Sequence, residues 1–256
     1  MSLRRASLVD LVVRGERAFR VVPVYSRLKA CLHADDVHFL VAAGSSAPAD
    51  RVLFLNLTFW HAGQNSDVLV DTNIDADVVA HAAWHHAAQR ALATGSAPTP
   101  AALFLGESVA SAFDLYVVGR MLRTGRQTAF LRSQVPLMSA ACGDAGLADE
   151  AIASLFTEVA EDPETAFREL RELLFDASLS LFGCVGAQDA VLCLDRFESH
   201  RFAGLLHHFA LSSWVLYARA YAGPSALGDP AAAADHAMRA APDALRWLED
   251  HWLSEG

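Results

Sequence analysis

The sequence predicts a mainly α-helical chain with a small β element near its N-terminus, which is an α+β fold class. From Asp75 almost to the C-terminus, apolar residues recur with the three- to four-residue spacing of amphipathic helices. Before Asp75, two short stretches rich in Val, Leu, Phe and Thr flank a run of turn-forming residues. An all-α helical bundle is the alternative fold class.

Length and composition indicate a single globular domain over 1–256. The chain has 256 residues, 53% of them hydrophobic, which is enough for a sizeable core. Its formal net charge of −10 would repel a phosphate backbone, so we expect no nucleic-acid partner. The composition identifies no substrate or protein partner and is compatible with an oligomer.

The cysteines and the apolar stretches predict a cytoplasmic location. Four cysteines without a CxxC pair are expected to be reduced, mostly buried thiols. Apolar stretches such as VLFLNLTFW and AALFL are shorter than the roughly 18–20 residues of a membrane span. Charges interrupt the apolar N-terminal residues before a signal-peptide cleavage site could follow. We therefore expect no contact with a membrane.

The predicted β element is a hairpin or edge pair. Its two strands are RVLFLNLTFW at 51–60 and DVLVDT at 67–72, joined by HAGQNS. Upstream, 15–34 favours a helix with a break near Pro23, and AAGSSAPAD at 42–50 favours a loop.

Two helices follow the predicted strands. The first runs from the N-cap candidate Asp75 to Leu92, and the second begins with Thr99 as N-cap and Pro100 as first residue and stops near Gly125. We interpret 50–124, the strand pair plus these two helices, as a candidate metal-binding core. The remaining helical region, 148–256, is predicted to contain helices at 148–161, 163–181, 196–221 and 230–252.

Two histidines on the first of these helices are the main functional signal. His81 and His85 are four residues apart, so they share a helix face with the apolar Val78, Ala88 and Leu92. Buried imidazoles need polar partners, and a pair at this spacing can converge on one metal ion. The alternative is that each is a separately hydrogen-bonded core histidine. The neighbouring Trp84 is expected in the core and His86 at the surface.

The next helix carries two carboxylates in an otherwise apolar stripe. Glu107 and Asp114 are seven residues apart and lie nearly on one face. A carboxylate in such surroundings must be paired, coordinated or protonated. Pairing with Arg120 or Arg123 is one interpretation. In the other, Glu107 completes a metal site with the two histidines, and Asp114 or Ser111 orients a ligating imidazole.

This part of the chain resembles a known family. Two strands, a helix with HAAWH at 81–85 and a second helix with GESVASAFD at 106–114 resemble the core of gluzincin metallopeptidases, the thermolysin-like zincins. The resemblance covers roughly residues 50 to 120. It implies a zincin-like α+β fold and a zinc ion held by His81, His85 and Glu107.

The chain departs from that family at one position. Where the family has a glutamate after the first histidine, this sequence has Ala82, whose methyl group cannot accept a proton. We therefore expect a zincin-like protein that keeps a metal and has lost or altered catalysis. Any activity would be that of a metal-dependent hydrolase without the usual general base.

Further histidines occur in FESHRFAGLLHHFALSSW. His200 and His207 would share one face of the helix predicted at 196–221, with His208 alongside. His207 or His208 is a candidate extra ligand or donor to a reacting oxygen, and a polar edge of a core helix is the alternative.

Two other functions remain open at this point. One is an iron protein of the helical-bundle type that recruits His200 or His207, although the Glu-x-x-His motif of such sites is absent. The other is a non-enzymatic helical interaction protein whose buried histidines only make hydrogen bonds.

Overall fold

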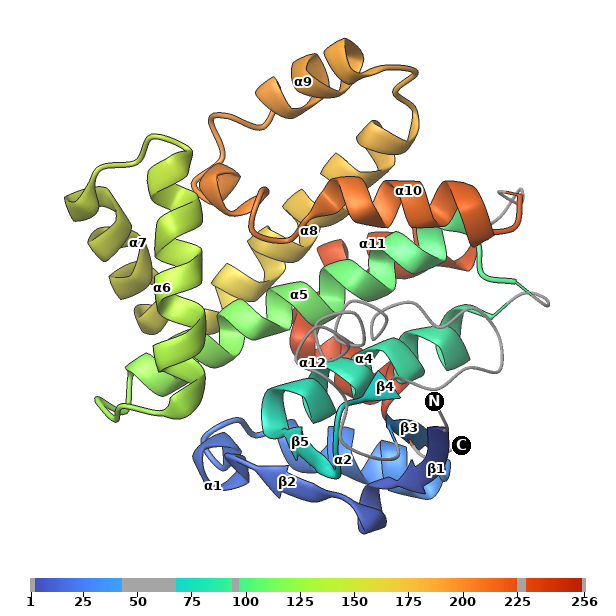
Figure 1. Cartoon of the computed structure of the whole chain (residues 1–256). Helices are drawn as coiled ribbons and strands as arrows, with labels where there is room; N and C mark the ends of the chain where they lie inside the picture. The colour runs from blue at the N-terminus through green and yellow to red at the C-terminus, as the bar shows by residue number, and fades with distance from the viewer. Residues whose placement is uncertain (1–2, 43–67, 94–96, 225–228, 255–256) are drawn as a thin grey trace.

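The computed structural model of the chain describes residues 3–42, 68–93, 97–224 and 229–254. It is mainly α-helical with a small N-terminal β element, so the predicted fold class is confirmed and the all-α alternative is wrong (Figure 1). The buried hydrophobic residues form one cluster that extends from Ala6 to Leu253.

The β element consists of two small sheets. In the first, β3 (His38–Ala42) pairs antiparallel with β1 (Leu3–Ser7) and parallel with β4 (Val68–Leu69). In the second, β2 (Val12–Arg14) pairs parallel with β5 (Asn73–Asp75). Of the predicted strand at 67–72, only Val68–Leu69 forms a strand, β4. The predicted strand at 51–60 and the turn after it lie outside the described residues.

Two short helices lie between the strands of the N-terminal part. They are α1 (Glu16–Phe19) and α2 (Tyr25–Ala34). The break between them contains Pro23, as predicted, because proline lacks the N–H group that a helix interior requires.

Helices α4 and α5 begin where the sequence predicts. α4 (Ala76–Leu92) has Asp75 as N-cap residue, and the carboxylate of Asp75 makes no capping hydrogen bond but accepts two hydrogen bonds from Arg14. α5 (Pro100–Leu122) has Thr99 as N-cap, and the Thr99 hydroxyl accepts a hydrogen bond from the Ala102 amide.

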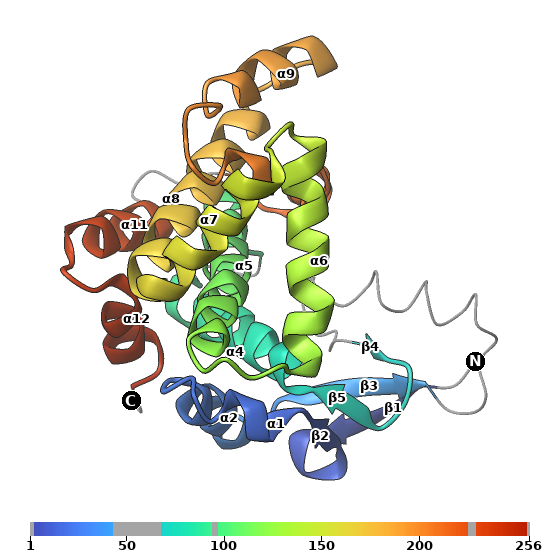
Figure 2. The same cartoon turned by 90° about the vertical axis from the view of Figure 1, so that its left-hand side faces the viewer.

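Helix α5 is the centre of the protein. It packs against α4 on one side and α8 on the other, as both views show (Figures 1 and 2). Among the described helices, only α5 is long and apolar enough to cross a membrane, but 83% of its most apolar window is buried inside the protein. A buried core helix can have the same length and apolar composition as a membrane-spanning helix. These two properties of α5 are therefore weak evidence for a membrane span.

The remaining helices surround α5. They are α6 (Ala129–Asp144), α7 (Asp149–Glu161), α8 (Pro163–Phe182), α9 (Ala187–Asp195), α10 (Leu211–Tyr221), α11 (Pro230–Ala240) and α12 (Ala244–Trp252). The predicted helices at 148–161 and 163–181 are confirmed as α7 and α8. Helices α6 and α9 were not among the helices that the sequence pattern predicted.

The predicted helix at 196–221 is wrong over its first half. Only α10 is an α-helix there, and it is preceded by turns and the 3-10 turn η2 (Ala203–Leu205). Gly204 lies so close to α6 that a Cβ at this position would be 3.2 Å from Cys142 Cα. Ala210 has a φ of 50°, which a helix interior does not allow. Packing against α6 thus overrides the local helical pattern.

The predicted helix at 230–252 is divided into α11 and α12. Ala241 is extended, with φ −73° and ψ 138°. It precedes Pro242, whose ring disfavours a helical conformation in the preceding residue. The proline therefore explains the break.

Candidate metal centre

Helices α4 and α5 approach each other closely at the position of the predicted metal ligands. Gly106 on α5 faces α4 so tightly that a Cβ there would be 3.1 Å from the Cβ of Ala88. The alanines that dominate α4 are almost all buried. Small residues on both helices therefore let longer polar side chains from the two backbones meet.

Three of the predicted ligands meet at this contact. His81 and His85 come from successive turns of α4, and Glu107 comes from the facing side of α5. The Nε2 atom of His85 is 3.1 Å from Glu107 Oε2, and Nε2 of His81 is 3.6 Å from Glu107 Oε1. The structure therefore brings together all three residues that the sequence predicted as ligands.

The spacing of these atoms fits a metal ion. One ligand atom from each residue can be chosen so that all three lie within 4.8 Å of one another. Two ligands bound tetrahedrally to zinc at about 2.0–2.1 Å are about 3.3 Å apart. The two observed nitrogen–oxygen separations lie on either side of this value, so small side-chain rotations would suffice.

Two polar atoms of this cluster are buried without a hydrogen bond. Within the described part of the chain, neither His85 Nε2 nor Glu107 Oε2 has a hydrogen-bond partner of acceptable geometry. Burying such atoms unsatisfied is costly. A cation between them would satisfy both, so the donor set fits a metal.

Two further residues of α5 contact the side chains of this cluster. The Ser111 hydroxyl donates a 3.3 Å hydrogen bond to Glu107 Oε1. Asp114 Oδ2 is 3.6 Å from Nδ1 of His81, the ring nitrogen opposite the one that faces Glu107. Asp114 therefore occupies the predicted position behind an imidazole, whereas Ser111 orients the glutamate instead.

The alternative of arginine pairing is wrong for Glu107. Arg120 forms an ion pair with Glu164 of α8, at 3.1 Å, and Arg123 is exposed. The neighbours of Glu107 are the two histidines and Ser111.

The electrostatics of the cluster favour positive charge. Burial alone would raise the pKa of Glu107, but the charges of His85 and His81 and the polar contact of Glu107 with each of them outweigh it and lower that pKa. Burial alone would lower the pKa of His81, but Asp114 and Glu107 outweigh it and raise that pKa. A protonated His81 thus supplies one positive charge between the two carboxylates, and a metal ion could take its place.

One acidic residue of this face was missed as a site residue. Asp77 precedes His81 by one turn of α4, so it continues the column of His81 and His85. Burial and the negative charge of Asp114 raise the pKa of Asp77 to about 6. The four-residue spacing from Asp77 to His81 was a signal that could have identified it.

The two adjacent histidines before α10 differ in their exposure to solvent. His208 is partly buried; burial lowers its pKa, and the charge of Asp114 partly offsets this. His207 is exposed, and the predicted helix that would align it with His200 does not exist. The helix face that His200 and His207 were predicted to share therefore does not form.

One prediction for the histidine helix is confirmed, and another needs correction. Trp84 is fully buried and packs edge-on against Phe113. His86 is only partly exposed, and its Nε2 lies 2.6 Å from a carboxylate oxygen of Asp35, so it is more than a plain surface residue.

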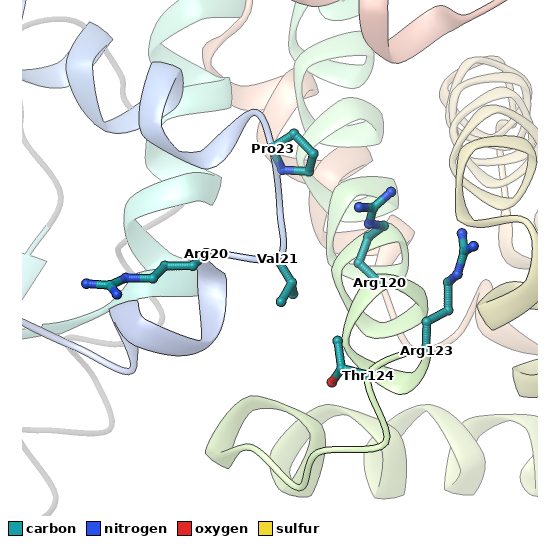
Figure 3. Close-up of a pocket in the computed structure, with 6 residues that line it drawn as sticks. All are labelled: Arg20, Val21, Pro23, Arg120, Arg123 and Thr124. Carbon is teal, nitrogen blue, oxygen red and sulfur yellow. The ribbon is translucent and has the colours of Figure 1, made fainter.

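A pocket at the other end of α5 is separate from this cluster. It measures about 480 Å³ and is lined by Arg20, Val21, Pro23, Arg120, Arg123 and Thr124. Figure 3 shows Arg120 and Arg123 near each other and the guanidinium of Arg20 pointing away from them. Arg120 is thirteen residues from Glu107, which is about 20 Å along a helix.

Comparison with known proteins gives no relative for this chain. No protein-family model, no curated protein and no solved structure matches it. The resemblance to gluzincin metallopeptidases stays a prediction carried by the residues of α4 and α5.

Proposed function

We propose that this protein is a zincin-like metal-binding protein that holds one zinc ion through His81, His85 and Glu107. The observation that carries the proposal is the convergence of two imidazoles and one carboxylate between α4 and α5, at separations of 3.1 and 3.6 Å. Imidazole and carboxylate are common zinc ligands, and three protein ligands leave a fourth position open.

The charges and the supporting contacts agree with this proposal. With both histidines neutral, Glu107 and Asp114 together carry two negative charges, which balance one divalent cation. Asp114 faces the Nδ1 atom of His81, so it favours the tautomer in which Nε2 is free to bind a metal. Ser111 holds the glutamate from the other side.

The chemistry of the site differs from that of an ordinary metallopeptidase. Zinc held by His81, His85 and Glu107 would supply Lewis-acid chemistry at its open position. Ala82 offers no proton-accepting group beside the cluster, and Asp77 and His208 are ionisable residues whose charges interact with Asp114. We therefore propose altered or lost catalysis, with metal-dependent hydrolysis as the reaction class of any activity.

A non-enzymatic function is the second candidate, and one observation favours it. His81 lies between Asp114 and Glu107, so its protonated form has carboxylate partners without a metal. In that case the cluster only fastens α4 to α5, and the protein works through protein partners. This candidate predicts that the cluster binds no zinc.

Elemental analysis distinguishes the two candidates. Untagged protein incubated with zinc and then dialysed should lose one equivalent of bound zinc when His81 and His85 are both replaced by alanine. A His207→Ala variant is the matched control, because that imidazole is exposed and should leave the zinc content unchanged. Equal zinc in wild type and double variant would refute the metal site and favour the interaction protein.

We also propose a cytoplasmic location. All four cysteines are free thiols, and Cys31, Cys142 and Cys193 are buried. Free, buried thiols are typical of proteins in a reducing compartment. Fractionation of cells that express the full chain would test this, and recovery in a membrane or secreted fraction would contradict it.

A further inference from the structure

A second group of potential metal ligands lies on the other side of α4. Cys31 and Asp35 are four residues apart at the end of α2, and His86 is on α4. A thiol sulfur, a carboxylate oxygen and an imidazole nitrogen from these residues lie within 4.8 Å of one another. The group is built from two helices that contact each other, and it shares no residue with the cluster of His81, His85 and Glu107.

The adjacent histidines of α4 explain why there are two groups. Consecutive residues of an α-helix point about 100° apart. His85 therefore faces α5 and Glu107, whereas His86 faces α2 and Asp35. The paired histidines in the sequence thus serve two different polar clusters.

The second cluster is centred on one oxygen atom. Oδ2 of Asp35 is 2.6 Å from His86 Nε2, 2.8 Å from Arg90 Nη1 and 4.0 Å from Cys31 Sγ. Three donor groups thus converge on a single carboxylate oxygen, which accepts a hydrogen bond from each of them. Such an arrangement allows a metal ion to replace the protons between sulfur, oxygen and nitrogen.

We propose that Cys31, Asp35 and His86 form a second metal site that binds a zinc-like divalent cation through sulfur, oxygen and nitrogen. Thiolate, carboxylate and imidazole are all zinc ligands. Cys31 is 8% exposed, whereas Asp35 and His86 are partly open to solvent. A water molecule can therefore complete a four-coordinate shell.

The required movements are small. Bond lengths of about 2.3 Å for sulfur and about 2.0–2.1 Å for nitrogen and oxygen place tetrahedral ligands about 3.3–3.6 Å apart. The nitrogen–oxygen contact of 2.6 Å must therefore lengthen and the sulfur–oxygen distance of 4.0 Å must shorten, each by less than about 1 Å. Rotation of two partly exposed side chains achieves this.

The protons and charges balance in this step. Cys31 loses its thiol proton to solvent, and His86 binds through Nε2 while its proton moves to Nδ1. One thiolate and one carboxylate then neutralise the divalent cation. The Nη2 atom of Arg90 keeps its hydrogen bond to the Trp252 carbonyl, at 2.9 Å. The Oδ1 atom of Asp35 remains available to accept a hydrogen bond from Nη1 of Arg90.

Cobalt(II) tests the proposal because it fills zinc sites and reports thiolate ligation directly. Full-length, untagged protein is titrated with cobalt under reducing, anaerobic conditions, and the near-ultraviolet thiolate-to-cobalt charge-transfer band is recorded. The double variant His81→Ala, His85→Ala should keep this band, because it retains the second site. Cys31→Ser, which is nearly isosteric, should abolish the band, and His86→Ala should weaken cobalt binding at least tenfold.

A second measurement makes the test independent of spectra. Zinc should slow the alkylation of Cys31 by iodoacetamide at least fivefold, as followed by peptide mass spectrometry, and His86→Ala should remove this protection. A charge-transfer band that persists in Cys31→Ser would overturn the assignment. So would the absence of any band in wild type at excess cobalt, which would leave only an ion-pair cluster between α2 and α4.

Discussion

Replacement of Glu107 by glutamine tests the electrostatics of the α4–α5 cluster most directly. The side chain is 5% exposed and contacts both histidines, and glutamine keeps its size while removing its charge. Breaking a buried ion pair by removing one partner costs about 3–5 kcal/mol. Since Asp114 remains 3.6 Å from His81, we expect the lower end of this range, about 3 kcal/mol.

This loss of stability should appear in thermal unfolding. In a chain of this size, about 1 kcal/mol corresponds to about 2–4 °C, so the Tm of Glu107→Gln should fall by about 6–12 °C in the presence of a chelator. Glu164→Gln is the matched control, because the Glu164–Arg120 pair is 41% and 27% exposed. Exposed pairs contribute about 0–1 kcal/mol, so this variant should melt within about 4 °C of wild type.

The effect should also depend on pH with a definite sign. The pKa of His81 is raised in the folded protein above its ordinary value of about 6.5, so its pairing stabilises fully below that pH and fades at alkaline pH. The difference in Tm between wild type and Glu107→Gln should therefore be largest near pH 6 and shrink towards pH 10. Identical Tm values at pH 6 in chelator would refute the ion-pair geometry on which the metal site rests.

Three further predictions follow from the structure. Gly119→Ala should destabilise the protein by about 1–3 kcal/mol in urea unfolding, because the new Cβ would be 2.5 Å from the Val159 carbonyl oxygen. Gly186→Ala is the control, because a Cβ there meets nothing within 4 Å and causes no such clash. Asp77→Asn should raise the Tm at pH 8 more than at pH 4, because burial and Asp114 raise the pKa of Asp77 to about 6 and its charged form destabilises the fold; a larger gain at pH 4 would contradict this. Zinc at about a hundred times the Kd of the α4–α5 site should stabilise the wild type by about 2.7 kcal/mol through that site, reversed by chelator. In calorimetry the double alanine variant of the two α4 histidines should lose this contribution.

The sequence by itself determined the local features of the α4–α5 unit. The capping hydroxyl of Thr99 and the four-residue spacing of His81 and His85 depend on neighbours within one or two helical turns. Such features are encoded by short-range geometry. For this reason the start of α5 and the shared face of the two histidines could be predicted without a fold.

Contacts between distant segments were decided only by the tertiary structure. Whether Glu107 meets histidines or an arginine depends on how α4 packs on α5, and no spacing along one helix specifies that packing. The same holds for the contact of His86 with Asp35, which joins residues fifty-one positions apart. The predicted helix at 196–221 failed for a related reason, since the packing of Gly204 against α6 outweighs local helical propensity. Helical periodicity fixes which side chains share a face, and only the packing of one face on another fixes what those side chains meet.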